Sequence, residues 1–239
     1  MSFNYFASFG KQNHMPNEQN HSIEIITSSD GSHTLYVPEL NEHYHSINGA
    51  VQESMHVFIQ AGLMQITKQE INLLEIGFGT GLNALLTNNY INSKKVYYHT
   101  IEKFPLEINT IEKLNYQSFC QNSKPHFFSD IHKCAWDISC PINPQFTIHK
   151  TKADFRTLEL ESIYDLVYFD AFGPNKQSDL WTFDIFKNLY SAMKPDAIFV
   201  TYCAKGEVRR QLKQAGFTVE RIAGAPRKRE MIRARKLPI

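Results

Sequence analysis

The sequence lacks the cysteine and histidine spacings that hold structural metal ions. None of its four cysteines forms a C-x-x-C pair or lies at zinc-ligand spacing from a histidine. Among the ten histidines only His43 and His45 are close together, and no third ligand is near them in the sequence. We therefore expect no metal site, and reduced, mostly buried thiols at Cys120, Cys134, Cys140 and Cys203.

Long hydrophobic runs and low-complexity tracts are also missing. No uncharged apolar segment approaches the roughly 18 residues that a membrane span needs, and residues 1–6 lack the basic flank and apolar stretch of a signal peptide. With 11 Gly and 10 Pro among 239 residues, of which 42% are hydrophobic, the composition is neither that of a linker nor that of a disordered protein. These absences predict a soluble cytoplasmic protein with no membrane partner.

The charge is nearly balanced overall but unevenly distributed. The net formal charge is +1, yet residues 205–239 contain eleven Lys and Arg against three Glu, which gives +8 there and −7 for the remainder. A basic segment on an otherwise acidic protein favours a polyanionic partner, with nucleic acid as the first candidate. The alternative is a solvated basic face that binds nothing.

Strand-like and helix-like segments alternate along most of the chain. A hairpin is predicted for residues 23–38 around the turn Asp30-Gly31, and a helix for residues 52–61. Strands then follow at 71–76, 96–101, 145–150, 164–169 and 197–202, with helices at 82–90, 106–114, 180–193 and 206–215. Two last strands, 217–223 and 230–234, flank the basic loop 224–229.

This alternation predicts an α/β fold with a mostly parallel, Rossmann-like sheet, a C-terminal antiparallel hairpin and an N-terminal β-rich extension. We place the extension at residues 1–62, packed on a core of residues 63–239. Ligands of such sheets bind beyond the carboxyl ends of the parallel strands.

A glycine-rich turn follows the first of these strands. Residues 75–81 read E-I-G-F-G-T-G, and the glycines allow a ligand to approach the backbone closely. Dinucleotide binding requires a glycine at the sixth position of the motif, where this chain has Leu82. The G-x-G-x-G spacing, with Glu75 two positions ahead of the first glycine, instead predicts S-adenosylmethionine as the ligand. A tight turn that needs glycine for shape alone is the alternative.

Acidic residues recur at the ends of the next strands. Glu102 is placed to accept the two ribose hydroxyls, and Asp154 to accept the adenine amino group. Asp170 ends the fourth strand, where a carboxylate can orient an amine nucleophile and stabilise the cation that forms. The alternatives are solvated loop carboxylates for Glu102 and Asp154, and a turn-forming role for Asp170. Nearby, Phe172 and Trp181 are either core residues or a stacking wall for a base.

Several longer motifs together resemble the methyltransferase domain of the MnmC family. They are E-I-G-F-G-T-G-L-N at 75–83, E-K-F-P at 102–105, D-A-F-G-P-N-K at 170–176, L-W-T at 180–182, G-E-V-R-R at 206–210, A-G-F-T-V at 215–219 and R-K-R-E-M at 227–231. The resemblance implies a class I methyltransferase that uses S-adenosylmethionine to methylate the 5-aminomethyl group of the wobble (2-thio)uridine of tRNA. Many members carry a fused flavin-dependent oxidoreductase domain that this sequence lacks, so the resemblance implies a stand-alone methyltransferase and a separate enzyme that supplies the aminomethyl precursor.

The motifs and strand ends together define the candidate site residues. For catalysis the candidate is Asp170. For the cofactor they are Glu75, Gly77, Gly79, Gly81, Asn83, Glu102, Lys103, Phe104, Asp154, Phe155 and Asp170. For substrate and tRNA they are Phe172, Lys176, Trp181, Lys205, Arg209, Arg210, Arg227, Lys228 and Arg229.

Three other functions remain open at this stage. An aminopropyl transferase similar to spermidine synthase has the same fold, but it requires an acidic pocket for a polyamine, whereas the basic C-terminal segment favours a polyanion. A methyltransferase that acts on another amine is the second alternative. A non-catalytic RNA-binding module is the third, although RNA binding alone requires neither the glycine turn nor Asp170.

Overall fold

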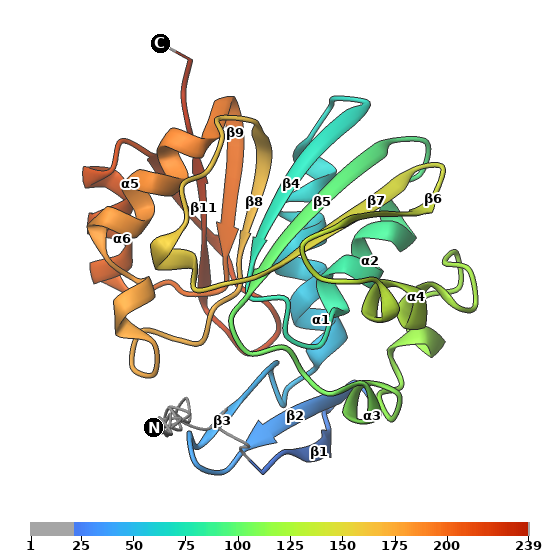
Figure 1. Cartoon of the computed structure of the whole chain (residues 1–239). Coiled ribbons are helices and arrows are strands. Elements are labelled where there is room, and N and C mark those ends of the chain that lie inside the picture. The colour runs from blue at the N-terminus through green and yellow to red at the C-terminus, as the bar shows by residue number, and fades with distance from the viewer. Residues whose placement is uncertain (1–21, 239) are drawn as a thin grey trace, which may run out of the picture.

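Eight strands form a central sheet in the order β10-β11-β9-β8-β4-β5-β7-β6 in the computed structural model, which describes residues 22–238 (Figure 1). In that order the strands are Thr218–Ala223, Glu230–Arg235, Met193–Thr201, Tyr164–Phe169, Glu70–Ile76, Lys95–Glu102, Phe146–Lys152 and Ser139–Asn143. The expectation about a signal peptide concerns residues 1–6 and lies outside the described residues.

The middle of this sheet is parallel and both of its edges are antiparallel. Strands β9, β8, β4, β5 and β7 run in one direction, whereas β10 and β11 form the predicted C-terminal hairpin and β6 pairs antiparallel with β7. The predicted fold class is therefore confirmed. The carboxyl ends of the five parallel strands meet at one edge, which is where such sheets bind ligands.

Helices cover both faces of the sheet (Figure 1). On one side lie α1 (Ala50–Ser54), the π-helix Met55–Gln60, α2 (Leu82–Tyr90) and α4 (Phe127–Lys133); on the other lie α5 (Phe183–Ala192) and α6 (Gly206–Gln214). In β8, Leu166 and Tyr168 pack into one core cluster, while Val167 and Phe169 pack into the other. Burial on both faces explains why residues 166–169 of this strand are all apolar or aromatic.

A small separate sheet lies beyond the carboxyl ends of the parallel strands (Figure 1). It consists of β1 (Glu24–Thr27), β2 (His33–Val37) and β3 (Glu42–His43), and the β1–β2 pair is the predicted hairpin. The helical segment that follows belongs to the main core, because the ring of Phe58 lies 5.1 Å from that of Tyr168. The proposed division of the chain at residue 62 stays a prediction.

The segment between β5 and β7 differs most from the sequence prediction. In place of a helix over 106–114 there is one short helix, α3 (Ile108–Ile111), followed by one 3-10 turn (Tyr116–Phe119) and α4. Asn115 ties this segment to the β1–β2 turn, since its side chain donates to Gly31 O and accepts from His33 N. The sequence analysis does not predict strand β6, which contains Pro141. Proline is tolerated in a strand at the edge of a sheet, and β6 is an edge strand.

The described residues contain neither a membrane-length apolar helix nor a metal-ligand cluster. In residues 22–238 no helix is long and apolar enough to cross a membrane. The same residues contain no group of three or more His, Cys, Asp or Glu arranged to hold a metal ion. All four cysteines are free thiols, with Cys120 and Cys203 buried.

Candidate active site

A cavity of about 610 Å³ opens at the carboxyl ends of β4, β5, β7 and β8. It lies within the size range of small-molecule binding sites. Eleven of the predicted site residues line it: Gly77, Gly79, Glu102, Lys103, Phe104, Asp154, Phe155, Asp170, Phe172, Lys176 and Lys228. The cavity wall does not include the other candidates, which are Glu75, Gly81, Asn83, Trp181, Lys205, Arg209, Arg210, Arg227 and Arg229.

The glycine turn needs its glycines for packing as well as for access. Gly77 has φ +91°, and a Cβ there would lie 2.9 Å from the carbonyl oxygen of Asp170. At Gly81 a Cβ would lie 2.6 Å from Nε2 of His132, so this glycine allows contact with α4. Both the ligand-access and the shape interpretations therefore have a physical basis, since Gly77 and Gly79 also line the cavity.

Glu102 is fixed by backbone donors on either side of its carboxylate. The N–H of Gly79 donates to Oε2 at 3.1 Å, and the N–H of Phe104 donates to Oε1 at 2.8 Å. Burial raises the pKa of Glu102, while these backbone hydrogen bonds act in the opposite direction. Beside it the ring of Phe104 is 56% exposed, so the cavity offers a fixed carboxylate next to an open aromatic surface.

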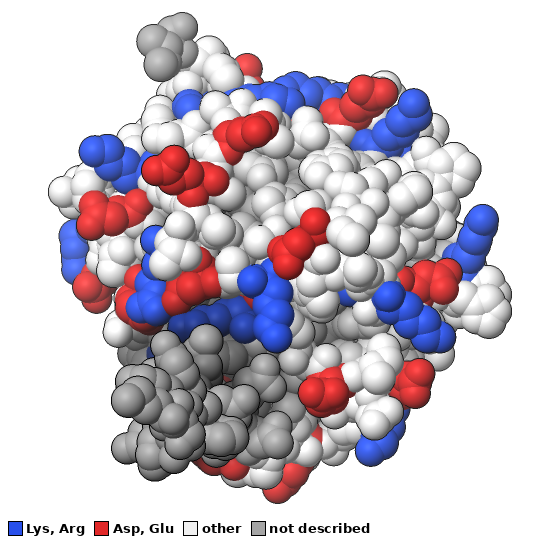
Figure 2. All heavy atoms as spheres, in the orientation of Figure 1, with Lys and Arg blue, Asp and Glu red and all other residues white. Residues whose placement is uncertain are grey.

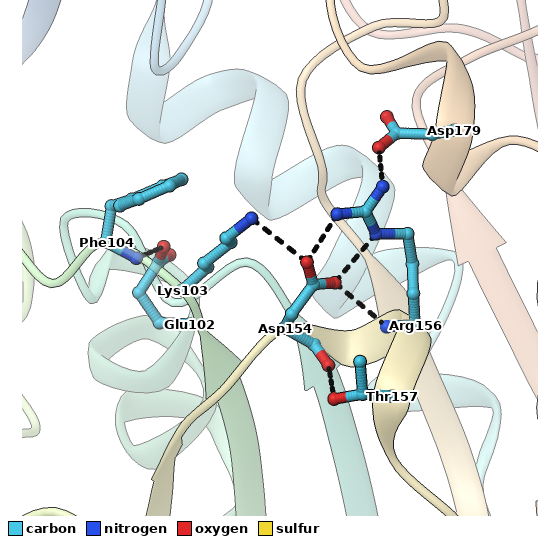
Figure 3. Close-up of polar contacts among 7 residues, drawn as sticks. All are labelled: Glu102, Lys103, Phe104, Asp154, Arg156, Thr157 and Asp179. Atoms are coloured by element: carbon cyan, nitrogen blue, oxygen red, sulfur yellow. Dashed lines mark hydrogen bonds and ion pairs between the residues drawn. The ribbon is translucent and has the colours of Figure 1, made fainter. Parts of the chain in front are cut away.

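Asp154 is engaged by two cations, as Figure 3 shows. Arg156 donates from its backbone N–H (3.1 Å) and its Nε (2.9 Å) to Oδ1, and Nζ of Lys103 lies 3.0 Å from Oδ2. The hydrogen bond from the Arg156 side chain holds the pKa of Asp154 well below its usual range. Arg156 also pairs with Asp179, so it joins the end of β7 to the loop after β8.

A buried chain of hydrogen bonds leads from Glu75 to Asp170. The amide of Asn83 donates to Oε1 of Glu75 at 3.0 Å and to Oδ2 of Asp170 at 2.8 Å, while Thr100 donates to the other oxygen of Glu75. Burial raises the pKa of Glu75 to about 8. Burial, and then the charge of Glu75, raise the pKa of Asp170 well above its usual range. Glu75 therefore acts on Asp170 from outside the cavity.

The N-terminal segment supplies cavity residues that the sequence analysis missed. Tyr44 lies against Gly79 and meets the ring of Phe172 edge-on at 5.1 Å between centroids. His45 Nε2 lies 2.6 Å from Oγ1 of Thr80 in the glycine turn, and burial lowers its pKa to about 4. The close His43 and His45 pair was the available signal; His45 contacts the glycine turn, and both residues line the cavity.

The far end of the cavity is built from residues of three distant segments. Glu53 of α1, Tyr202 after β9 and Lys228 of the loop before β11 all line it together with Asp170. Tyr202 donates its hydroxyl to Ala171 O at 2.9 Å. Lys228 forms an ion pair with Glu53, and its Nζ lies 4.9 Å from the centre of the Tyr202 ring.

Trp181 is a core residue, in disagreement with the predicted substrate contact. Its side chain is only 3% exposed and packs against Phe169, with ring centroids 4.9 Å apart. Its Nε1 donates to Phe172 O at 2.7 Å. An indole buried in this way holds the loop after β8 in place and is not accessible to a base.

The basic C-terminal residues are partly paired. Arg221 and Arg233 bind Glu230 and Glu220, Arg227 donates to Asn48 Oδ1, and Lys205 donates to Asn175 Oδ1. Figure 2 shows Lys and Arg side chains interspersed with Asp and Glu on the face it presents, instead of a field of one sign. Glu220 and Glu230 are already counted in the +8 of residues 205–239, so these pairs engage two of the arginines and leave the net charge of the segment unchanged.

Comparisons with known proteins agree with this geometry. A family model described as S-adenosyl-L-methionine-dependent methyltransferase matches residues 114–237. The bifunctional protein MnmC of tRNA 5-methylaminomethyl-2-thiouridine biosynthesis is 29% identical over 233 residues in Cupriavidus metallidurans and 30% over 208 residues in Thiobacillus denitrificans. These matches cover 90% and 80% of this chain but 34% and 33% of the relatives, so the chain spans about a third of their length.

Solved structures extend the likeness to the fold. The crystal structure of MnmC2 from Aquifex aeolicus aligns with a TM-score of 0.71 and 25% identity, covering 93% of this chain and 73% of that one. Spermidine synthase from Thermotoga maritima aligns with a TM-score of 0.60 at 14% identity over 92% of this chain and 70% of that one, which is a likeness of fold alone. With just over half of its residues matched by the family model, and its glycine turn and acidic strand ends gathered at one cavity, the chain belongs to the S-adenosyl-L-methionine-dependent methyltransferases.

Proposed function

We propose that this methyltransferase transfers a methyl group to the amino nitrogen of the 5-aminomethyl group on the wobble uridine of tRNA, giving 5-methylaminomethyl-2-thiouridine. The observation that carries the proposal is the partly buried carboxylate of Asp170, held by Asn83 at the wall of the cavity. The likeness to MnmC proteins over 80–90% of the chain supports the choice of tRNA as substrate.

The residues around Glu102 suit S-adenosylmethionine. The carboxylate of Glu102 is the acceptor for the ribose hydroxyls, and Phe104 provides an exposed apolar surface for the adenine ring. Phe155 also lines the cavity but is only 3% exposed. When bound, S-adenosylmethionine supplies an activated methyl group. Because Arg156 and Lys103 already donate to Asp154, the adenine amino group has to displace one of them to bind there. We therefore assign Asp154 mainly the role of positioning Arg156, ahead of a contact with adenine.

Asp170 prepares the acceptor amine. A primary alkyl amine has a pKa near ~10, so at neutral pH most of it is protonated and cannot react. A carboxylate whose pKa is raised by burial can take that proton and then hold a remaining N–H, which leaves the nitrogen lone pair free. Asn83 fixes the orientation of the carboxylate, and Glu75 fixes Asn83 from behind.

We assign the tRNA contacts to basic residues of α6 and of the loop before β11. Arg209 and Arg210 lie on α6, and Arg227 and Arg229 flank Lys228 in the loop before β11. Such side chains hold nucleic acid through its phosphates, while a splayed-out base enters a pocket. With tRNA as substrate we also assign the protein to the cytoplasm, and we assign the supply of the aminomethyl precursor to a separate enzyme.

A direct assay distinguishes this function from aminopropyl transfer. The cavity wall includes Glu42, Glu53 and Asp170, so it has the acidic lining that a polyamine enzyme requires. The purified protein is incubated with S-adenosylmethionine and tRNA that carries 5-aminomethyl-2-thiouridine, and the nucleosides are analysed by mass spectrometry. A mass gain of one methyl group at the wobble position supports the proposal. Turnover of decarboxylated S-adenosylmethionine with putrescine, and none with tRNA, would replace it by the rival function.

A further inference from the structure

A primary ammonium group of the chain itself lies at the wall of the cavity that Asp170 lines. It belongs to Lys228, which forms an ion pair with Glu53 and lies 4.9 Å above the centre of the Tyr202 ring. The Glu53 side chain is 12% exposed and that of Lys228 is 36% exposed, so the carboxylate is largely withdrawn from water while the lysine keeps about a third of its surface in contact with it. All three residues line the same cavity as Asp170.

The surroundings of this ammonium match those that recognise an aminomethyl group. A carboxylate gives a charge-assisted hydrogen bond, and an aromatic face attracts a cation. The terminal CH₂–NH₃⁺ of lysine is chemically the same group as the protonated aminomethyl substituent of the proposed nucleoside. Lys228 therefore places a group of this chemical class between Glu53 and the ring of Tyr202.

The loop that carries Lys228 is also a segment on which the proposed phosphate contacts lie. Arg227 and Arg229 are its immediate neighbours, and Arg227 donates to Asn48 Oδ1 at 2.9 Å. Lys228 and Arg227 thus hold the loop to residues 48 and 53 of the N-terminal segment. Phosphate groups that attract this loop act on the same side chains that hold it against the cavity.

We propose that Glu53 and Tyr202 form the seat of the substrate's amino group, and that Lys228 fills this seat until a tRNA phosphate draws it away. The exchange replaces one ammonium group by another beside Glu53, so the largely buried carboxylate is never left unpaired. The incoming ammonium then lies in the cavity that Asp170 lines, where it loses its proton. This inference rests on the proposed function. It makes the departure of Lys228 from Glu53 a condition for binding of the substrate's amino group.

The test compares two substrates that differ in phosphate. One is tRNA that carries 5-aminomethyl-2-thiouridine, and the other is the free nucleoside 5-aminomethyl-2-thiouridine, which has no phosphate. In the wild type the nucleoside leaves Lys228 in place and should react poorly. Lys228→Met opens the seat, so kcat/KM for the nucleoside should rise about tenfold while kcat/KM for tRNA falls. Lys228→Gln is a second variant that keeps a polar side chain and should behave in the same direction.

Glu53→Gln tests the seat itself. It should raise KM for both substrates about tenfold, with a smaller change in kcat and no change in the affinity for S-adenosylmethionine measured by calorimetry. Lys213→Met is the matched control, because it removes an exposed positive charge of α6 outside the cavity. It should not raise the turnover of the nucleoside.

The outcomes separate this inference from the proposed function. If folded Lys228 variants methylate tRNA but show no gain with the nucleoside, or if Glu53→Gln leaves KM unchanged, the seat is wrong although the enzyme is a tRNA methyltransferase. If the wild type methylates no tRNA at all, the proposed function fails. Binding of S-adenosylmethionine by each variant shows that it is folded.

Discussion

The carboxylate of Asp170 accepts a hydrogen bond from the Asn83 amide at 2.8 Å, and the second N–H of that amide is held by Glu75. Asn83 comes from the first turn of α2 and Asp170 from the end of β8, so the contact joins the glycine turn to the acceptor end of the cavity. The orientation of Asp170 is therefore determined by residues outside the cavity.

Asp170→Asn should reduce methyl transfer by about 10²–10⁴-fold, as is typical of a positioned acid-base group. The substitution keeps the shape and a hydrogen-bond acceptor but removes the negative charge that takes the amine proton. Single-turnover rates with saturating tRNA measure the effect. Affinities for S-adenosylmethionine and tRNA should stay nearly intact; a fully active variant would show that Asp170 is a turn residue only.

The raised pKa of Glu75 predicts that the stability of the folded protein depends on pH. Its pKa is raised from 4.5 to about 8 in the folded protein, so between these values the folded state binds more protons than the unfolded state. Stability from this group is therefore complete below about pH 4.5 and is lost as the pH rises toward 8. The slope is at most about 1.4 kcal/mol per pH unit.

Urea unfolding of the wild type and of Glu75→Gln at several values between pH 5 and pH 8 checks this dependence. The difference between the two proteins should change with pH, with the wild type losing stability relative to the variant as the pH rises. Glu112→Gln, at an exposed position, is the control and should give a constant difference. A constant difference for Glu75→Gln as well would mean that Glu75 is ionised throughout this range.

Glu102→Gln should weaken binding of S-adenosylmethionine by about 10–100-fold, since hydrogen bonds to a charged group contribute about 1.5–3 kcal/mol. The new amide also directs an N–H toward one of the two backbone donors, Gly79 or Phe104, that now hold the carboxylate. Titration calorimetry measures the affinity. Equal affinities for variant and wild type would remove Glu102 from the ribose site.

The joint replacement of Arg227 and Arg229 by Ala should weaken tRNA binding and reduce its salt dependence by about two units in the log–log slope, because each lost phosphate contact contributes about one. Filter binding at several salt concentrations provides the slope. Replacing Arg221 and Arg233, which are paired with Glu230 and Glu220, is the matched control and should leave the slope unchanged. If both double variants behave alike, the loop is a solvated basic face.

Local sequence pattern was sufficient for much of the central sheet. The predicted strand 164–169 coincides with β8, and α2 has the predicted bounds Leu82–Tyr90. Strands β4, β5, β7 and β9 also occur in the predicted order, although some of their ends differ by several residues. Apolar periodicity and glycine are local signals, so these elements can be recognised without knowledge of their neighbours.

The same local signals failed where a partner element decides the structure. Residues 106–114 contain helix-compatible spacing, but Asn115 holds the end of this segment to the β1–β2 turn, and only a short helix forms. Trp181 is a residue type that can stack on a base, yet its indole packs on Phe169 in the core. In both positions a distant contact overrides what the local sequence favours.

The sequence alone determined the parallel sheet, the glycine turn and the acidic residues at the strand ends, because each is encoded in a few consecutive residues. Only the tertiary structure decided what closes the cavity. Lys228 and Glu53 are 175 positions apart in the chain, and Tyr44 and Phe172 are 128 positions apart. Such pairs leave no periodic trace in the sequence, since their proximity depends on how the N-terminal segment packs against the loop after β8 and the loop before β11.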